Sequence, residues 1–216
     1  MTPTVRLTAI LKHRSGALRQ VPLRLEAGFT MVETLVVVGL IGVICAIAVP
    51  MTANAIANFR VTGDTRSVSN ATALAKMRAA SNFSRVRLYV DRTGSSHHLE
   101  VWNKVTGHWT TVGGTTHLST HVTFGYGVVS EPPLGTQDFI GQAAPCTDDA
   151  GTDITNTSCL MFNSRGVPVD NLGAPTALDA LYLTDGSAVY AVTLSATGML
   201  RVWRTPPVAM PTWVLQ

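Results

Sequence analysis

The sequence has few charged and few aromatic residues. Of 216 residues, 13% are charged and 6% are aromatic, whereas 46% are hydrophobic. This composition excludes an intrinsically disordered chain, and the length suits one ordinary domain with appendages. The mean hydropathy of +0.24 is high for a soluble protein, which indicates that one segment concentrates the apolar residues.

The sequence also lacks the short motifs that mark common active sites. It contains no G-x-S-x-G, no Walker A run, no C-x-x-C and no H-E-x-x-H. His97 and His98 fall in an expected turn, and His108, His117 and His121 are scattered over expected strand edges, so we interpret all five as surface residues. We therefore expect neither an enzyme nor a protein that holds a cofactor or a metal.

One long apolar run follows the N-terminal stretch. No charged residue occurs between Glu33 and Arg60, and residues 35–51 read LVVVGLIGVICAIAVPM. A helix of about 20 residues spans the roughly 30 Å hydrocarbon core of a bilayer. The sequence predicts a single membrane-spanning helix, and Pro50 is expected to bend it.

The basic charge of the chain has a local origin. Five of the first 28 residues are basic and one is acidic, a net charge of +4, whereas the whole chain carries +3, so the rest carries −1. The sequence pI near 9.0 is therefore weak evidence for nucleic-acid binding. The positive-inside rule places this stretch in the cytoplasm and sends the C-terminal part across the membrane.

The residues at the start of the apolar run do not fit either of the two ordinary kinds of apolar N-terminus. A secretory signal is cut after its apolar region and a simple anchor is not cut, but neither accounts for EAGFTMVETLVVVGLIGVICAIAVP. Gly28, Phe29, Thr30, Glu33 and Pro50 in this stretch resemble the type IV prepilin family. The resemblance implies that prepilin peptidase cuts between Gly28 and Phe29 and N-methylates Phe29, although a 28-residue leader is longer than the short leaders common in this family.

Glu33 is the one charge at the edge of the apolar run. A carboxylate inside a membrane costs on the order of 2 to 3 kcal/mol on insertion scales. The resemblance implies that Glu33, fifth residue of the mature chain, pairs with the N-terminus of a neighbouring subunit in a filament. The alternative is a carboxylate that lies in the headgroup region.

We predict an α+β, pilin-like fold, in which a long N-terminal helix precedes an antiparallel domain of two sheets. The segments are a leader (1–28), a transmembrane helix (29–52), its amphipathic continuation (53–81), an exported β domain (82–204) and a Pro-rich tail (205–216), extended or loose, with Trp213 as a candidate partner contact. The apolar residues expected to pack the continuation onto the domain are Ile56, Phe59, Val68, Leu74 and Met77. Gly63 and Asp64 mark a place where the helix can break.

Alternation of polar and apolar residues predicts the strands. Residues 85–90 and 99–102 form a hairpin, and further strands are expected at 109–112, 117–126, 159–162, 180–184, 188–194 and 199–204. Turns at 185–186 and 197–198 join the last three into a meander. The runs CLMFNSRGVPVDN and ALYLTDGSAVYAVTLSATGMLRVWR resemble the C-terminal half of the GspH/FimT minor pseudopilins. That resemblance depends on Phe162, Arg165, Gly166, Gly198, Arg201 and Arg204.

The three cysteines differ in location. Cys45 lies in the apolar run, whereas Cys146 and Cys159 enclose a polar loop in the exported part. In an oxidising compartment these two can form a disulfide, worth about 3 kcal/mol for a loop of this size, and two free thiols are the alternative. The acidic residues of the loop lack the spacing of an EF-hand, so we expect a solvated loop without calcium.

These observations predict a minor subunit of a type II secretion pseudopilus or a related type IV pilus, used for protein secretion. It would lie in the bacterial inner membrane with a periplasmic domain, and its partners would be other pilins, prepilin peptidase and the inner-membrane assembly platform. The alternative is a pilus subunit that binds DNA for uptake. Arg201, Trp203 and Arg204 are the candidate DNA contacts, because arginines bind phosphate and a tryptophan stacks on bases.

Overall fold

The computed structural model describes residues 29–216, so the expected leader and Gly28 lie outside the described residues. The chain divides into two compact units, one up to Ala46 and one from Ile47 onward. Helix α1 (Met31–Ser81) runs from the first unit into the second.

In the described part of the first unit, residues 31–46 are helical and every side chain is exposed. The apolar segment Met31–Val49 has a mean hydropathy of 2.6, and none of it is buried. At 1.5 Å per residue its 19 residues extend about 28 Å, which matches the hydrocarbon core of a bilayer by length and composition. The segment therefore fits a single-pass membrane anchor by its length and composition.

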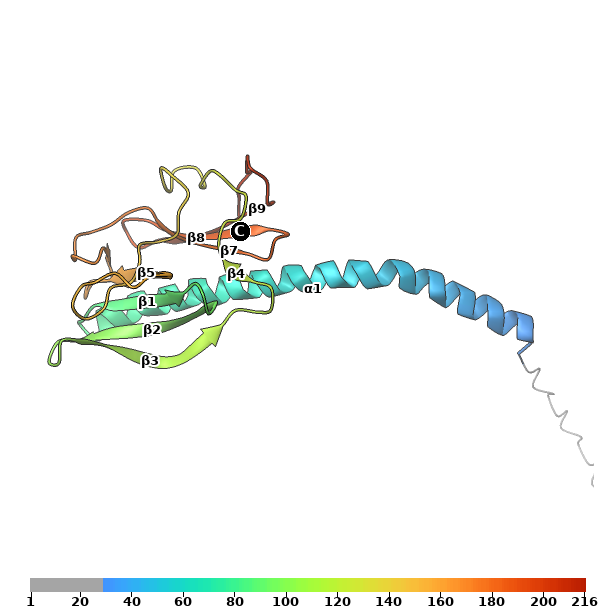
Figure 1. Ribbon diagram of the computed structural model, residues 1–216, viewed down its shortest axis with the longest axis horizontal. Coiled ribbons are helices and arrows are strands. Elements are labelled where there is room, and N and C mark those ends of the chain that lie inside the picture. The colour runs from blue at the N-terminus through green and yellow to red at the C-terminus, as the bar shows by residue number, and fades with distance from the viewer. Residues whose placement is uncertain (1–28) are drawn as a thin grey trace, which may run out of the picture. The chain divides into compact units, whose positions relative to one another are not determined.

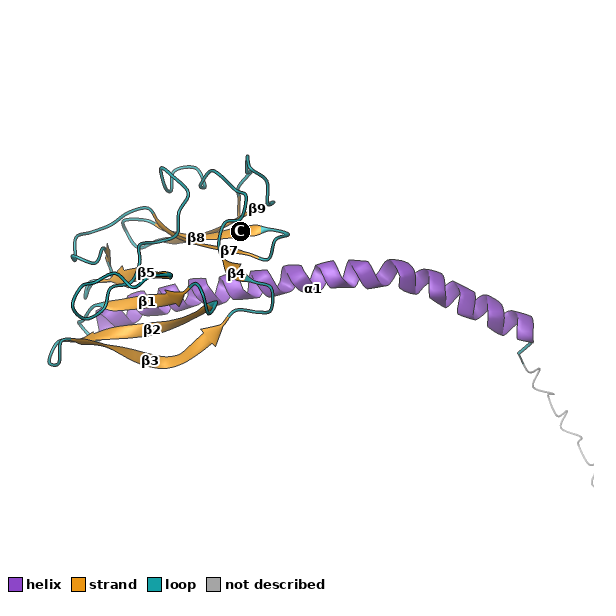
Figure 2. Ribbon diagram, in the orientation of Figure 1, coloured by secondary structure: helices purple, strands orange, loops and turns teal. Residues whose placement is uncertain are grey.

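The second unit contains the rest of α1 and two antiparallel sheets (Figures 1 and 2). The strands are β1 (Val86–Asp91), β2 (Ser96–Asn103), β3 (His108–His117), β4 (Thr123–Phe124), β5 (Thr157–Phe162), β6 (Pro168–Val169), β7 (Asp179–Thr184), β8 (Val189–Leu194), β9 (Leu200–Thr205) and β10 (Val214–Leu215). The first sheet has the order β3-β2-β1-β5-β6 and the second β10-β9-β8-β7-β4. The predicted fold class, a long N-terminal helix followed by two antiparallel sheets, is confirmed.

The predicted hairpin is β1 with β2, in which Leu88 lies opposite Leu99, and the predicted meander is β7-β8-β9. The strand expected at 117–126 is wrong. β3 ends at His117, and of residues 118–126 only Thr123 and Phe124 form a strand, which belongs to the second sheet. His121 has a φ of 72°, which is incompatible with an extended strand, and residues 118–122 carry the chain from one sheet to the other.

A stripe of small residues on α1 forms the centre of the main core. Its members recur every three or four residues: Val61, Thr65, Val68, Thr72, Ala75 and Ala79. Thr65 and Thr72 each donate their hydroxyl to the carbonyl four residues earlier, at 2.7 and 2.8 Å, so neither buried hydroxyl lacks a partner. This face packs on the inner faces of both sheets in one core, where Leu88, Leu160 and Leu181 are fully buried.

The predicted packing face of the helix is wrong except at Val68. Ile56, Phe59, Leu74 and Met77 are 45%, 77%, 37% and 62% exposed. At 100° per residue these four lie on the side of the helix opposite Val61 and Val68. The prediction selected the large apolar residues as the buried face of the helix. In the structure, the face that packs on the sheets consists of Val, Thr and Ala instead.

The helix does not break at Gly63 and Asp64. The carboxylate of Asp64 accepts hydrogen bonds from the amide (2.8 Å) and the hydroxyl (3.1 Å) of Ser119, just after β3. Asp64 therefore ties the helix to the segment that connects the two sheets.

A second core covers the outer face of the second sheet. Ala180, Tyr182, Val189 and Ala191 are buried there with Val129, and Trp203 and Trp213 pack against them. The tail is therefore not loose, because its strand β10 pairs with β9 and Trp213 is half-buried. The indole Nε1 of Trp213 donates to the carbonyl oxygen of Glu131 at 2.9 Å. This contact gives Trp213 a role within the domain.

Candidate functional site

The first turn of α1 holds the residues expected to direct processing and assembly. The amide of Glu33 donates to Oγ1 of Thr30 at 3.2 Å, and the amide of Thr34 donates to the carbonyl oxygen of Thr30 at 3.1 Å. Thr30 is therefore the N-cap, and Thr30-x-x-Glu33 is the sequence pattern of a capping box, a signal that the sequence analysis did not use. Phe29 precedes the cap and is 77% exposed.

The carboxylate of Glu33 has no ion pair and accepts no hydrogen bond among the described residues. It lies in the first turn, where the exposed backbone amides favour a negative charge. Pro50 lies further along α1, which continues through it to Ser81. Gly28, the residue expected before the cleaved bond, lies outside the described residues.

Gly166 and Gly198, two of the residues on which the resemblance of the C-terminal half depends, lie beside Lys76 of α1. Gly166 and Gly198 adopt φ values of 73° and 72°. A Cβ on Gly198 would lie 2.8 Å from Nζ of Lys76 and 3.1 Å from the carbonyl oxygen of Gly166. Both positions therefore require glycine for backbone conformation and close packing. Phe162, four residues before Gly166, is fully buried. Arg165 is exposed in the turn between β5 and β6.

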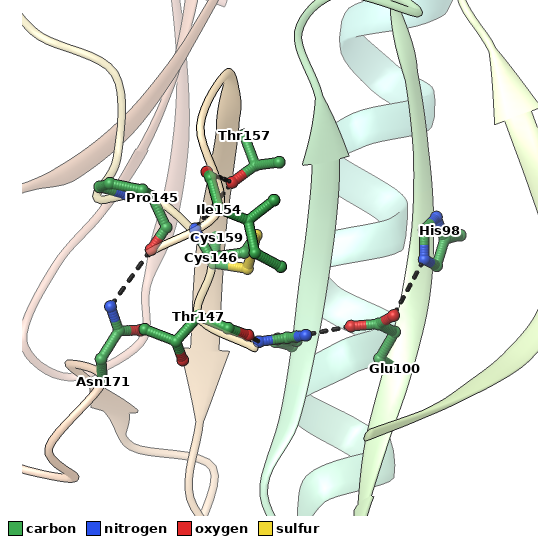
Figure 3. The surroundings of a disulfide bond; sticks show 10 residues. His98, Glu100, Pro145, Cys146, Thr147, Ile154, Thr157, Cys159 and Asn171 are labelled. Carbon is green, nitrogen blue, oxygen red and sulfur yellow. Dashed lines mark hydrogen bonds and ion pairs between the residues drawn. A yellow bond between two sulfur atoms is a disulfide. The ribbon is translucent and has the colours of Figure 1, made fainter. Parts of the chain in front are cut away.

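A disulfide joins Cys146 to Cys159 and fastens the acidic loop to β5 (Figure 3). The buried guanidinium group of Arg87 donates to the carbonyl oxygen of Thr147 at 2.7 Å and to Glu100 at 2.6 Å. His98 lies 3.2 Å from the other carboxylate oxygen of Glu100. The start of the loop is thus held against β1 and β2 as well as β5.

The carboxylates of this loop bind the chain itself. Asp149 accepts hydrogen bonds from the amide of Trp109 (2.8 Å) and Nδ1 of His108 (2.7 Å), and these bonds lower the pKa of Asp149. The carboxylate of Asp148 accepts hydrogen bonds from the amides of Ala150 and Thr152. Within residues 29–216 no group of three or more His, Cys, Asp or Glu side chains is placed to hold a metal ion.

The histidines do not all lie at the surface. His97 is 3% exposed, because β2 begins at Ser96, earlier than expected, and places this ring opposite Val90 on the inner face. Its Nδ1 has no hydrogen-bond partner within residues 29–216, and Nε2 lies 3.5 Å from Oγ of Ser67 on α1. Burial lowers the pKa of His97. The surface interpretation is thus wrong for His97, whereas His108, His117 and His121 are exposed.

The three candidate DNA contacts do not form one surface. Trp203 is half-buried in the second core, and its Nε1 donates to Oγ1 of Thr193 at 3.0 Å. Arg204 lies on the other face of β9, with its guanidinium carbon 5.8 Å from the centre of the Tyr190 ring. Because side chains alternate along a strand, Arg201 shares the face of Trp203 and not that of Arg204.

Arg204 instead shares a groove with Arg66, a residue that the sequence analysis did not single out. The groove has a volume of about 510 Å³ and is lined by α1, Tyr190, Arg204 and Gln216. No local pattern joins Arg66 to Arg204, because only the packing of α1 on the second sheet brings them to one groove.

Comparisons with known proteins identify only distant structural similarity. The sequence matches no protein-family model, and no curated protein matches it. Two solved structures of the minor pseudopilin EpsH from the type II secretion system of Vibrio cholerae are similar, each with 12% identity over 73% of this chain. They are covered over 96% and 97% of their length, with TM-scores of 0.35 and 0.41. Similarity at this level does not establish function.

Proposed function

We propose that this protein is a non-enzymatic, membrane-anchored subunit of a pilus-like filament, a minor subunit of a type II secretion pseudopilus or a related type IV pilus. The observation that carries the proposal is the 19-residue apolar helix with Glu33 in its first turn, which leads directly into the helix of a two-sheet domain. In this proposal the N-terminus faces the cytoplasm and the domain faces the periplasm of a bacterial inner membrane.

The start of α1 is compatible with cleavage after Gly28. The helix begins at Met31 and is capped by Thr30, so removal of the leader leaves the cap and the helix complete. Cleavage creates a positive α-amino group on Phe29, next to the positive end of the helix dipole. A carboxylate from outside the chain stabilises that amino group, and Glu33 of a neighbouring subunit supplies one.

The exposed side of the helix gives a second reason to expect neighbours. The apolar segment is exposed along its whole length, and four large apolar side chains further along the same helix, Ile56, Phe59, Leu74 and Met77, are also exposed. Soluble monomers rarely leave so much contiguous apolar surface uncovered. In a filament, the helices of adjacent subunits would cover both regions, and the assembly platform and peptidase would meet the anchor before assembly.

Intact mass and N-terminal sequencing of the native protein, with and without prepilin peptidase, test the processing step. We expect a mature chain that starts at methylated Phe29 only when the peptidase is present. Gly28→Ala should block cleavage. An uncleaved chain, or one cut after the apolar run, would overturn the proposal.

Glu33 is tested separately from cleavage. Glu33→Gln keeps the size of the side chain and removes its charge, so processing should persist while incorporation into filaments falls. Thr34→Ala in the same turn is the control and should assemble normally. Normal assembly of Glu33→Gln would exclude the proposed pairing.

DNA capture gains no support from the described residues. Of the three candidate contacts, Trp203 serves the core, and the two arginines lie on opposite faces of β9. The chain after residue 28 also carries a net charge of −1, which opposes binding to a polyanion.

A further inference from the structure

A groove between α1 and the second sheet carries positive charge beside an uncovered aromatic ring. Its volume is about 510 Å³, and its lining includes Phe59, Arg66, Tyr190 and Arg204 but no acidic side chain. Arg66 and Arg204 are exposed, and neither forms an ion pair within residues 29–216. Phe59 is 77% exposed. Because guanidinium groups pair well with carboxylates, the groove suits an acidic partner that also brings an apolar side chain.

Residues 130–140, in the connection between β4 and β5, form a loop of the opposite charge. Glu131 and Asp138 are exposed, and neither forms an ion pair within the described part of the chain. Leu134 and Phe139 of the same loop are 95% and 87% exposed. The loop thus combines two carboxylates with two large apolar side chains. It is complementary to the groove both in charge and in apolar character.

Hydrogen bonds hold this loop on the domain although its apolar side chains are exposed. The side-chain amide of Gln137 donates to the carbonyl oxygen of Gly141 at 3.0 Å, and its oxygen accepts from the hydroxyl of Tyr182 at 2.7 Å. Nε1 of Trp213 holds the start of the loop through the carbonyl oxygen of Glu131. A loop that is already fixed loses little conformational freedom when it binds, so less of its contact energy is spent on ordering.

The groove and the loop lie on opposite sides of the second sheet. Val129 and Ile140, at the two ends of the loop, pack with Val189 and Ala191 on the outer face. Tyr190 lies between these two residues of β8, so its side chain points to the other face, where the groove lies. Figure 1 shows the connection after β4 on the side of the second sheet away from α1. The sheet therefore separates the loop from the groove of the same chain, and a loop that fills the groove comes from another chain.

We propose that the acidic loop of one copy of this chain binds in the arginine groove of a second copy. The two carboxylates of the loop would pair with the two guanidinium groups, and Phe139 would pack against the exposed ring of Phe59. A contact between unlike surfaces leaves one groove and one loop unoccupied in a pair of copies, so it can repeat head to tail. The inference goes beyond the proposed function, because it does not depend on the membrane anchor or on processing.

Sedimentation velocity of the full chain in density-matched detergent micelles measures this association over a range of protein concentrations. The groove variant is Arg66→Glu with Arg204→Glu, and the loop variant is Glu131→Lys with Asp138→Lys. Each variant alone places like charges opposite each other, so we expect its association to weaken at least roughly tenfold. An equimolar mixture of the two variants places opposite charges at both contacts between unlike copies. The mixture should therefore associate nearly as strongly as the wild type.

The matched control is Arg165→Glu with Arg201→Glu, because both arginines are exposed and lie outside the groove. It should leave the association unchanged, whereas Phe139→Ala should weaken it without a change of charge. Unfolding temperatures close to that of the wild type show that each variant is folded. A wild-type chain that stays monomeric, folded variants that do not recover on mixing, or an equal loss in the control would overturn the proposal. So would association that persists in both charge-reversed variants, because it would arise from the apolar helix alone.

Discussion

The Nζ of Lys76, in the last part of α1, donates a hydrogen bond to the carbonyl oxygen of Gly198 at 2.9 Å. The same lysine side chain lies beside Gly166, with its Cγ 3.2 Å from where a Cβ of that glycine would be. One side chain of the helix thereby joins the turn after β5 to the turn between β8 and β9. The two sheets are connected to α1 at this end by close packing that only glycine permits.

We expect Gly198→Ala to lower the free energy of unfolding by about 2 to 3 kcal/mol. The positive φ costs a residue with a Cβ about 1 to 2 kcal/mol, and displacement of the Lys76 ammonium group loses a hydrogen bond worth about 1 kcal/mol. Urea denaturation measures the change. Gly186→Ala is the control, because its φ is 85° but no atom lies within 4 Å of the added Cβ, so only the conformational cost applies. Equal losses in the two variants would contradict the packing argument.

Removal of the disulfide by Cys146→Ser with Cys159→Ser should destabilise the domain by about 3 kcal/mol. The bridge closes a loop with a sequence separation of 13 and so restricts the unfolded chain. Thermal unfolding of the full chain with and without a reductant measures the effect. Cys45→Ser, in the anchor, is the control and should leave the unfolding temperature unchanged. Insensitivity of the wild-type domain to reductant would refute the prediction.

Glu100→Gln should destabilise the protein by about 3 kcal/mol, because it leaves a buried guanidinium group without a counter-charge. The side chain of Arg87 is only 3% exposed, and burial lowers the pKa of Arg87 while Glu100 opposes that shift. Chemical denaturation compares this variant with the exposed Glu131→Gln, which should be neutral. Replacement of both partners, Arg87→Met with Glu100→Leu, should cost less than Glu100→Gln alone. If the double variant is the less stable one, the unpaired charge is not the cause.

Stability should fall as the pH decreases below about 6.5, because His97 is buried in the neutral form. Its pKa in the folded state is lowered by burial, with His98 acting in the same direction and Asp64 opposing it, whereas the unfolded value is about 6.5. The unfolded chain therefore binds the additional proton first, and the loss is at most about 1.4 kcal/mol per pH unit. Urea denaturation at several pH values should show that His97→Asn removes this slope. His117→Asn, at an exposed position, should retain it.

Several features of the fold were predictable because their signals are local. The apolar anchor is one uninterrupted run, and the alternation around Leu88 and Leu99 specifies a hairpin whose turn lies between them. The meander of β7, β8 and β9 follows from short turns at Gly186 and Gly198, both with positive φ. Each of these signals involves residues that are neighbours along the chain.

The errors arose where distant residues decide the outcome. The face of α1 that consists of Val, Thr and Ala is buried because both sheets pack on it. A search for large apolar residues in the sequence selects the opposite face. His97 is buried because β2 begins at Ser96 and α1 covers it. Trp213 joins the core because the tail pairs with β9.

The sequence alone determined that this chain has an apolar helix long enough to span a membrane, with one carboxylate at its start, followed by an antiparallel β domain. These properties depend on the order and polarity of adjacent residues. Only the tertiary structure decided that Arg201 and Arg204 lie on separate faces, that Arg66 joins Arg204 in one groove, and that Lys76 meets two glycines. Those juxtapositions arise when α1 packs on both sheets, because burial of its small-residue face brings together side chains that are far apart in the chain.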